Sequence, residues 1–250
     1  MLTGIVLTHN EEKNIARCLE SLKFCDAVLV VDSGSTDKTI SLAKKAGATV
    51  VNHPLDGNYA AQRNWALSQA KTPWVLFVDA DEMVSVKLGE EITSAVKKIE
   101  YKGFLIPRID YMWGKKLSHG DVGGARFLRL ARRGAGEWHG AVHETWAIEG
   151  NIGTLKHPIF HYPHPTLVEF LQEINRYSSI RAQELHRAGQ RANLFQIILY
   201  PSAKFLWLWI WKLGFADGTT GFVHAMTMAF YSFLVRGKLW LFQKGVTSPS

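Results

Sequence analysis

The chain has 250 residues, 47% hydrophobic and 20% charged, so it can form a packed core and does not have the composition of a disordered protein. Its net charge of +7 is uneven, because residues 1–99 carry 11 Lys and Arg against 12 Asp and Glu, whereas residues 100–250 carry 18 against 10. Basic, aromatic-rich composition can indicate nucleic acid, an anionic membrane or a phosphorylated substrate, but no nucleic-acid-binding motif accompanies it here, so nucleic acid is not an expected partner.

The first part of the chain alternates short apolar runs with amphipathic segments, which predicts an α/β fold with a mostly parallel, Rossmann-like sheet and helices on both faces. Continuous apolar runs of this length are typical of strands that are buried on both sides. No Gly-x-Gly-x-x-Gly follows the first strand and no Walker loop is present, which argues against a dinucleotide fold. The predicted strands are 2–8, 27–31, 48–51 and 74–78, and the predicted helices are about 11–22, 36–45, 59–70 and 85–99.

The first two predicted strands end in polar side chains that suit ligand binding. Thr8, Asn10 and Glu11 follow the first strand, and Asp32 follows the second. Asn10 is also the predicted N-cap of the helix that follows. Because the carboxyl ends of parallel strands meet at one edge of a sheet, we expect these side chains to lie together. A carboxylate at the second strand suits a hydrogen bond to a base or a ribose.

The apolar run at 74–78 ends at two carboxylates, Asp79 and Asp81, with one residue between them. On an extended backbone they point the same way, so they repel each other unless a cation or several donors lie between them. Mg²⁺ typically uses one or two carboxylates together with substrate phosphates. The motif predicts a metal-assisted diphosphate site, although an isolated Asp-x-Asp is more often an acidic surface turn.

From residue 103 the pattern changes, and runs at 104–108 and 125–130 predict strands that extend the sheet in mixed orientation. His143 and Glu144 follow them. The spacing of the later histidines matches no standard zinc site. We expect most of the arginines near this segment to form a solvated basic face, and Arg126 to contact an anionic acceptor. These arginines are Arg126, Arg129, Arg132 and Arg133.

The last third of the chain is predicted to be helical. Thr166 and Glu169 form a capping box that opens a helix ending near Gly189, and a second apolar helix is expected at 222–235. Between them, residues 194–213 combine tryptophans with flanking lysines. This segment falls short of the roughly 20 uninterrupted apolar residues of a spanning helix. We therefore expect it to lie in a membrane interface, and a buried core helix is the alternative.

Four motifs occur in order between residue 1 and about residue 150: Thr-His-Asn-Glu-Glu, Asp-Ser-Gly-Ser-Thr-Asp, Gln-Arg-Asn and Asp-Ala-Asp-Glu. In this order they resemble the inverting family-two glycosyltransferases with a GT-A fold. The second half is similar to the bacterial lipopolysaccharide core enzymes of the WaaE/KdtX type. The resemblance implies a nucleotide-sugar-binding catalytic domain at 1–160 and a helical, basic and aromatic-rich extension at 161–250.

The resemblance implies transfer of a hexose from a nucleotide-diphosphate sugar, with UDP the expected nucleotide, to a hydroxyl of a lipid-anchored glycan such as lipopolysaccharide core. Glu144 matches the catalytic base, although many members have Glu-Asp where this chain has His143-Glu144. His143 is then a metal ligand, an acceptor contact or a structural residue. The resemblance also implies binding roles for the other residues. Thr8, Asn10 and Glu11 would line the nucleotide pocket, and Asp32 would bind the nucleotide base. Arg63 and Asn64 would lie near the diphosphate and donor sugar, Asp79 would face the ribose, and Asp81 would be a ligand of Mg²⁺ or Mn²⁺.

Two alternatives remain open at this point. One keeps the enzyme but makes a polyprenyl phosphate the acceptor, and the other is a non-catalytic nucleotide-sugar-binding scaffold at a membrane. The only cysteines, Cys18 and Cys25, make no disulfide framework, and no signal peptide precedes the first strand. We therefore expect a cytoplasmic protein that is peripheral on the inner face of the cytoplasmic membrane.

Overall fold

The computed structural model describes residues 1–140, 144–163 and 166–246. The chain divides into two compact units. The sheet unit consists of Met1–Ile109 and Ala125–Tyr162, and the helical unit consists of Asp110–Gly124 and Pro163–Ser250. Each unit is described by itself below.

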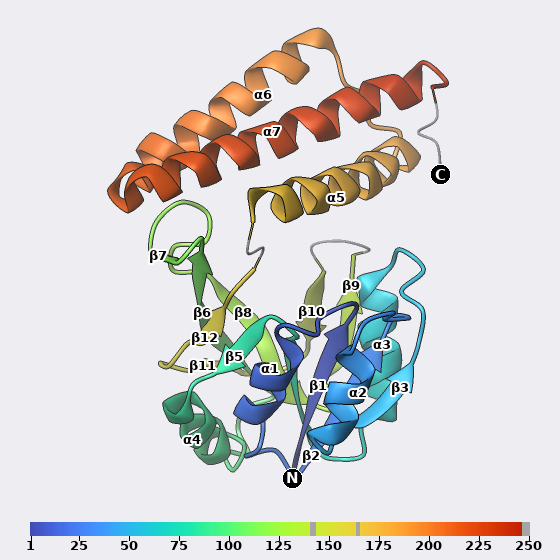
Figure 1. Cartoon of the computed structure of the whole chain (residues 1–250), viewed down its shortest axis with the longest axis vertical. Coiled ribbons are helices and arrows are strands. Elements are labelled where there is room, and N and C mark those ends of the chain that lie inside the picture. The colour runs from blue at the N-terminus through green and yellow to red at the C-terminus, as the bar shows by residue number, and fades with distance from the viewer. Residues whose placement is uncertain (141–143, 164–165, 247–250) are drawn as a thin grey trace. The chain divides into compact units, whose positions relative to one another are not determined.

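The parallel half of the sheet has the strand order β3-β2-β1-β4, so the predicted parallel α/β core is confirmed (Figure 1). The direction of winding reverses between β1 and β4, which is where open α/β sheets bind ligands. The strands are β1 (Leu2–Thr8), β2 (Ala27–Asp32), β3 (Thr49–Asn52) and β4 (Trp74–Asp79), and the helices are α1 (Ile15–Ser21), α2 (Thr39–Lys45), α3 (Tyr59–Gln69) and α4 (Val86–Ala95).

Alternate residues of the central strands bury on opposite faces of this sheet, as the two-residue period of a strand requires. One core joins Val6 and Leu76 to apolar side chains of α1, α2 and α4. The other joins Ile5 and Phe77 to α3 and to two stacked tryptophans. Helices therefore cover both faces, and the polar groups at the strand ends lie at the edge between two apolar layers.

The rest of the sheet is mixed, as predicted. Strand β8 (Arg126–Arg132) pairs antiparallel with β4 and with β6 (Gly103–Met112). Five shorter strands of the sheet unit were not anticipated, because three or four residues are too few to show a period. These are β5 (Glu82–Val84), β9 (Gly136–His139), β10 (Thr145–Ile148), β11 (Ile152–Thr154) and β12 (Ile159–His161). Strands β9 and β10 pair with each other in a separate two-stranded sheet.

The first two helices begin later than predicted. Helix α1 starts at Ile15 because the chain after β1 first makes a turn, in which Asn10 has the left-handed φ of 56°. Asn10 is therefore not an N-cap, and its side chain is used elsewhere. Helix α2 starts at Thr39, whose backbone N–H donates to the carboxylate of Asp37.

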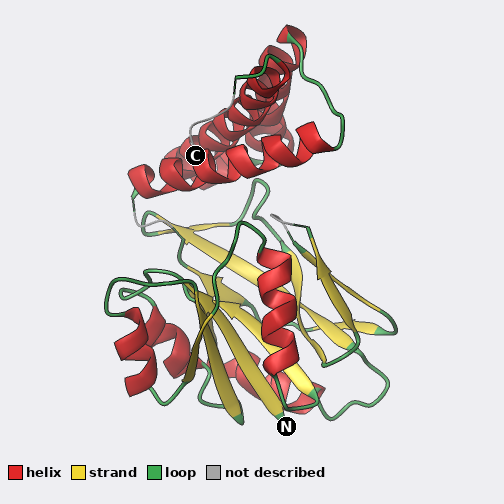
Figure 2. Cartoon of the chain, turned by 90° about the vertical axis from the view of Figure 1, so that its right-hand side faces the viewer, coloured by secondary structure: helices red, strands yellow, loops and turns green. Residues whose placement is uncertain are grey.

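The helical unit contains α5 (Leu167–Arg187), α6 (Leu194–Leu206) and α7 (Gly218–Gln243), and Figure 2 shows them as an all-helical group. The predicted cap at Thr166 is confirmed, since its hydroxyl accepts from the N–H of Glu169. Helix α7 packs against both α5 and α6. A π-helix, η1 (Trp207–Trp211), and a short 3₁₀ turn, η2 (Gly214–Asp217), connect α6 to α7, and β7 (Lys115–Leu117) completes the unit.

Candidate active site

The register of the parallel strands brings the predicted strand-end residues to one edge. Thr8 lies beside Asp32 of β2, and Leu7 lies beside Asp79 of β4. Three neighbouring strands thus deliver Asp32, Thr8 and Asp79 side by side, as expected from the topology. The hydroxyl of Thr8 is buried and has no hydrogen-bond partner among the described residues. A buried polar atom without a partner is costly, so it favours a ligand or water at this edge.

Asp32 organises the loop that follows β2. Its side chain is fully buried, and its carboxylate accepts from the N–H groups of Gly34 and Ser35 at 2.9 and 2.8 Å and from the Ser35 hydroxyl at 2.5 Å. Gly34 has a φ of 89°, a conformation that side chains with a Cβ rarely adopt. The carboxylate therefore shapes a turn at the ligand-binding edge, and its predicted contact with a base stays a prediction.

Asn10 and Glu11 connect the loops after β1 and β2. The Asn10 side-chain oxygen accepts from the N–H of Thr36 at 2.8 Å, and the Glu11 N–H donates to the Thr39 hydroxyl at 2.7 Å. The pKa of Glu11 is raised to about 7, and burial of the carboxyl is the largest cause. A hydrogen bond from Asn14 acts in the opposite direction. The charges of acidic neighbours, Asp81 among them, act in the same direction as burial. Carboxylates thus converge here, and a cation would relieve their repulsion.

Asp79 is held between two arginines. Its Oδ1 accepts from Arg63 Nη2 at 2.8 Å, and its Oδ2 accepts from Arg129 Nη2 at 2.6 Å. Burial alone would raise the pKa of Asp79, but the guanidinium groups of Arg129 and Arg63 hold that pKa well below its usual range. Both oxygens are engaged within the protein, so the predicted contact with the ribose would add to two existing ion pairs.

Arg129 is not part of a solvated basic face, so that prediction was wrong for this residue. It is 7% exposed and lies within 3.4 Å of Glu82 Oε1 as well as against Asp79. The other oxygen of Glu82 accepts the Asp79 N–H at 2.9 Å. Strand β8 points Arg129 inward and leaves Arg126, the predicted acceptor contact, exposed at the start of the strand. The pairing of β8 with β6 skips Arg129, because Phe104 pairs with Leu130 and Leu105 with Leu128. A β-bulge at Arg129 therefore sets its direction, and no local motif signals it.

Asp81 pairs with a residue that the sequence did not single out, His161 of β12, at 3.2 Å between Oδ2 and Nε2. The two come together because β12 runs antiparallel to β5, directly after the Asp-Ala-Asp-Glu motif. Burial raises the pKa of Asp81, whereas His161 lowers it, and the net direction is downward.

This pair fits a divalent cation. Carboxylate and imidazole are both metal-ligand types. Within the described ranges there is no cluster of three or more metal-ligating side chains. Two protein ligands nevertheless suffice when diphosphate oxygens and water complete the shell, as is usual for Mg²⁺. Asp81 and His161 are therefore the residues that would hold the cation.

Glu144, the predicted base, belongs to the same network. Its Oε1 accepts from Arg63 Nε at 2.7 Å, so one guanidinium bridges Glu144 and Asp79. His143 lies outside the described residues. Asn64, predicted near the donor sugar, uses its amide in a two-point hydrogen bond with the backbone of Trp138, at 2.9 and 2.8 Å. It ties α3 to β9 and so places its neighbour Arg63.

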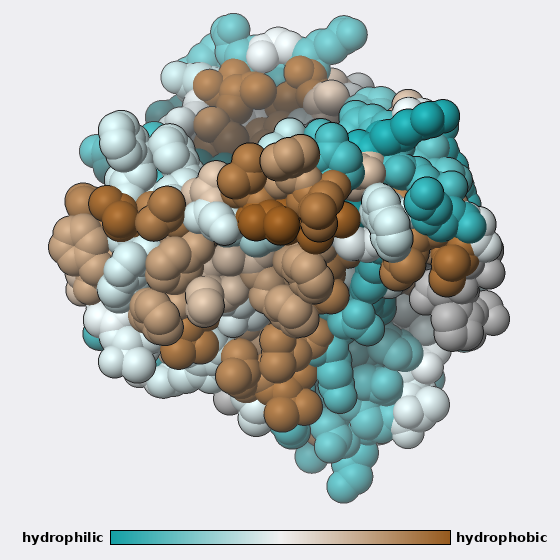
Figure 3. Space-filling model, turned by 90° about the horizontal axis from the view of Figure 1, so that it is seen from above, coloured by the Kyte–Doolittle hydropathy of each residue, from teal (hydrophilic) through white to brown (hydrophobic). Residues whose placement is uncertain are grey.

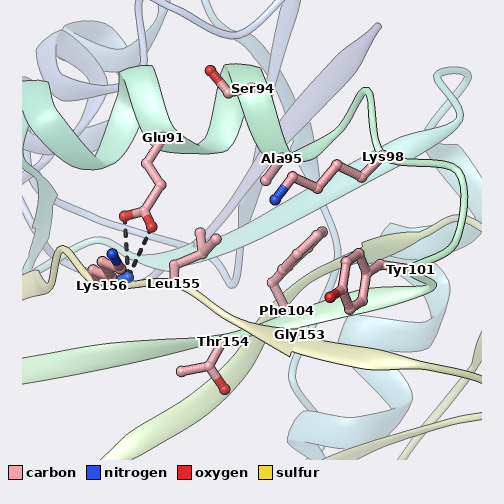
Figure 4. A pocket seen from close by; sticks show the side chains of 10 residues that line it. All are labelled: Glu91, Ser94, Ala95, Lys98, Tyr101, Phe104, Gly153, Thr154, Leu155 and Lys156. Carbon is pink, nitrogen blue, oxygen red and sulfur yellow. Dashed lines mark hydrogen bonds between the residues drawn. The ribbon is translucent and has the colours of Figure 1, made fainter.

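A cavity of about 210 Å³ lies elsewhere, between α4 and β11 (Figure 4). Its most prominent charged group, Glu91, is turned toward the backbone of Lys156 and accepts that N–H at 2.9 and 3.1 Å. The N–H of His157 donates to the same carboxylate at 3.0 Å. Local backbone groups therefore satisfy Glu91, and the convergent polar groups that mark a binding site lie at the strand edge instead.

The sequence matches the model of the family described as "Glycosyl transferase family 2" over residues 3–148. It is 33% identical to "Lipopolysaccharide core biosynthesis glycosyltransferase LpsC" of Rhizobium meliloti, over 96% of this chain and 92% of that protein. It is 29% identical to "Uncharacterized glycosyltransferase RT0209" of Rickettsia typhi, over 95% of this chain and 86% of that protein.

The fold resembles that of S. aureus TarS 1–349, with a TM-score of 0.51 and 18% identity over 98% of this chain and 91% of that chain. This likeness concerns the fold alone and agrees with the expected GT-A type. The family match covers more than half of the chain and includes every strand-end motif that carried the resemblance. The chain is a glycosyltransferase that belongs to glycosyl transferase family 2.

Proposed function

We propose that this enzyme transfers a hexose from a UDP-sugar to a hydroxyl of a lipid-anchored glycan, with inversion at the anomeric carbon. The observation that carries the proposal is the Arg63 bridge, which joins the carboxylate of Asp79 at the donor edge to Glu144. A donor site and a proton acceptor are thereby parts of one buried network.

The reaction follows from these groups. The acceptor hydroxyl passes its proton to Glu144 while its oxygen forms a bond to the anomeric carbon. The bond from that carbon to the diphosphate breaks, and its electron pair leaves with the nucleoside diphosphate. A divalent cation at Asp81 and His161 would act as a Lewis acid on the diphosphate. Attack from the face opposite the leaving group inverts the configuration.

The similarity to LpsC, a lipopolysaccharide core biosynthesis glycosyltransferase, supports a lipopolysaccharide core glycan as the acceptor class. The helical unit supports a membrane location, because it exposes large apolar side chains that a soluble surface rarely gathers. Among the described residues, one helical stretch, Leu194–Trp211, is long and apolar enough to cross a membrane. Only 6% of this stretch is buried in the protein. Apolar side chains gather over a broad area of the face in Figure 3. The most exposed along this stretch are Leu194, Phe195, Ile198, Leu199 and Trp211.

We propose that this surface docks in the interface of the cytoplasmic membrane, on its inner face. Lys212 lies over the ring of Trp207 and Lys244 over that of Trp240, each at 5.8 Å from the centroid. Paired Trp and Lys side chains at the ends of apolar helices are typical of anchoring at the lipid headgroups. The exposure of α6 argues against the alternative of a buried core helix.

A donor screen tests the proposed function. The full chain is incubated with Mn²⁺ and each of a set of UDP-, GDP- and dTDP-hexoses, with rough-type lipopolysaccharide or, in parallel, a polyprenyl phosphate as acceptor. Release of the nucleoside diphosphate is measured. Release with a UDP-hexose, together with a β-linked product from an α-linked donor, is the expected result. Release only with polyprenyl phosphate would mean that the acceptor is a polyprenyl phosphate and not a lipid-anchored glycan. No release with any donor, alongside UDP binding, would favour the non-catalytic scaffold.

A further inference from the structure

We propose that Arg63 is a positioning residue that fixes the carboxylate of Glu144 and acts on sugar transfer through it. This inference rests on the proposed function, in which Glu144 takes the proton of the acceptor. The sequence resemblance placed Arg63 near the diphosphate, whereas the structure turns its hydrogen bonds toward two carboxylates of the protein.

The geometry of the guanidinium carries the inference. Arg63 is 3% exposed, its Nε donates to Glu144 at 2.7 Å, and its Nη2 donates to Asp79 at 2.8 Å. These two nitrogens belong to one rigid plane, so the directions of both bonds are set together. Glu144 therefore takes its orientation from a group that is itself anchored at the donor edge.

The anchor at Asp79 is held from its other side. Arg129 donates to the second oxygen of Asp79 at 2.6 Å and lies near Glu82, which in turn accepts the Asp79 N–H. A buried ion pair of this kind is costly to rearrange, because breaking it leaves an uncompensated charge. The Asp79 end of the bridge consequently behaves as a fixed point.

Packing leaves the Arg63 side chain little freedom. Its guanidinium carbon lies 4.8 Å from the centroid of the Trp138 ring and 5.5 Å from that of Phe77. Trp138 is itself held by the amide of Asn64, the next residue of α3. The same helix therefore places the guanidinium and the ring on which it packs.

The consequence concerns the reaction geometry. Glu144 immediately precedes β10 and follows residues outside the described ranges. Arg63 is the hydrogen-bond donor that the described part of the chain provides for it. A general base must meet the acceptor proton within hydrogen-bond distance, and misplacement of a reacting group by about 1 Å can cost 10²-fold in rate. Holding one oxygen of Glu144 orients the other toward the acceptor.

The test is a double-mutant cycle with Arg63→Lys and Glu144→Gln. A lysine keeps the charge but cannot make both bonds of the rigid fork. We expect Arg63→Lys to lower kcat by about 10- to 100-fold. UDP affinity by titration calorimetry should change less than about threefold, because the variant keeps the positive charge beside Asp79. The double variant should be no slower than Glu144→Gln alone, because Arg63 has no base left to orient. Turnover is measured as UDP release from the donor that the screen selects.

The possible failures are distinguishable. If the kcat losses of the two single variants multiply in the double variant, Arg63 does not act through Glu144. The positioning role is then overturned, while the proposed function stands. If Glu144→Gln retains full turnover, the proposed base is wrong and the inference falls with it. Should Arg63→Lys not fold, Arg63→Gln, which keeps an N–H donor in place of the guanidinium, goes through the same cycle.

Arg132→Lys is the matched control. Arg132 also packs on a tryptophan, with its guanidinium carbon 4.8 Å from the Trp74 centroid, but its Nε donates to the backbone oxygen of Tyr101 at 3.2 Å. The control makes the same substitution at a stacked arginine outside the site. Its kcat should stay within about twofold of the wild type, since it touches neither carboxylate.

Discussion

The two units depart in opposite ways from the usual distribution of polar and apolar side chains. The sheet unit buries charged groups, with Asp32 at 0% exposure and Arg63 at 3%, whereas the helical unit exposes large apolar ones, with Phe195 at 74% and Trp211 at 73%. Each departure costs free energy unless something compensates it. In the sheet unit the protein supplies the compensation through ion pairs and backbone N–H groups. For α6 no residue of the helix itself is buried, and under the membrane proposal lipid supplies the compensation.

The comparison separates two kinds of functional surface. Buried charges whose partners are already in place are preorganised, so they need no rearrangement when charge develops in the reaction. The exposed apolar face of the helical unit is, under the membrane proposal, a binding surface that lipid covers. Breaking the first should affect turnover and stability, and breaking the second should affect location alone.

The largest expected effect is at the metal position. Asp81→Ala removes the carboxylate of the predicted cation site, and we expect transfer to fall by about a thousandfold or more, because Lewis-acid assistance is worth several kcal/mol. The measurement is nucleoside diphosphate release with Mn²⁺ titrated. The control is Glu100→Ala, at an exposed acid of the same unit, which should behave as the wild type. Full activity of Asp81→Ala would remove the metal role.

The next effect tests the base. Glu144→Gln keeps the shape of the side chain but cannot take a proton, so kcat should fall by about 10²–10⁴-fold. UDP binding should persist, because the bonds at Asp79 and Asp32 are untouched. Glu137→Gln, an exposed position on the neighbouring strand β9, is the matched control. Unchanged turnover in Glu144→Gln would move the base to another residue.

A third prediction concerns stability rather than turnover. Arg129→Met leaves the buried Glu82 and the half-buried Asp79 with one cation fewer, so the free energy of unfolding should drop by about 3–5 kcal/mol. Urea unfolding measures it. Arg126→Met on the same strand removes an exposed arginine and should change the value by less than about 0.5 kcal/mol. Equal effects of the two variants would contradict the buried network.

The fourth prediction moves to the helical unit. Trp211→Glu places a charge on the exposed apolar face, so binding of the full chain to vesicles of phosphatidylethanolamine and phosphatidylglycerol should weaken by about tenfold or more. Co-sedimentation measures it, and soluble turnover should not change. Ile99→Glu, at a residue of the sheet unit that is 83% exposed, should leave binding as it is. If the intact wild type does not sediment with vesicles, the membrane proposal is lost.

The smallest effect is at Asp217, which closes the loop of the helical unit. Its carboxylate accepts from the N–H groups of Ser118 and His119 at 3.0 and 2.8 Å and lies 3.0 Å from the His119 ring nitrogen. Burial acts to raise the pKa of Asp217, but the His119 ring and the two N–H groups hold it below the ordinary 3.8. A group whose pKa is lowered by folding stabilises the folded state fully at pH values above its unfolded-state pKa. That contribution is lost as the pH falls through its folded-state pKa.

We therefore expect Asp217→Asn to cost about 1–2 kcal/mol at pH 7, since hydrogen bonds to a charged group are worth somewhat more than neutral ones. Urea midpoints of wild type and variant, measured from pH 7 downward, should begin to converge below the unfolded-state pKa and meet below the folded-state pKa. A gap that stays constant into acid would mean that the charge of Asp217 contributes nothing.

Much of the sheet unit could be predicted, because strands buried on both faces leave continuous apolar runs and each run stops at the residues that bind ligands. Asp32, Asp79 and Asp81 were found in this way. Asn10 was assigned to the wrong local role, because a residue that suits an N-cap also tolerates the left-handed conformation of a turn, and its hydrogen bond to Thr36 crosses 26 positions.

The sequence by itself determined the order of the elements, the edge at which the polar groups gather, and the family, since these depend on periodicity and on short motifs. Only the tertiary structure decided which partner each charge has. Arg129, His161 and Glu144 reach Asp79, Asp81 and Arg63 through the pairing of distant strands. The physical reason is that an ion pair depends on position in space, whereas a sequence pattern records only spacing along the chain.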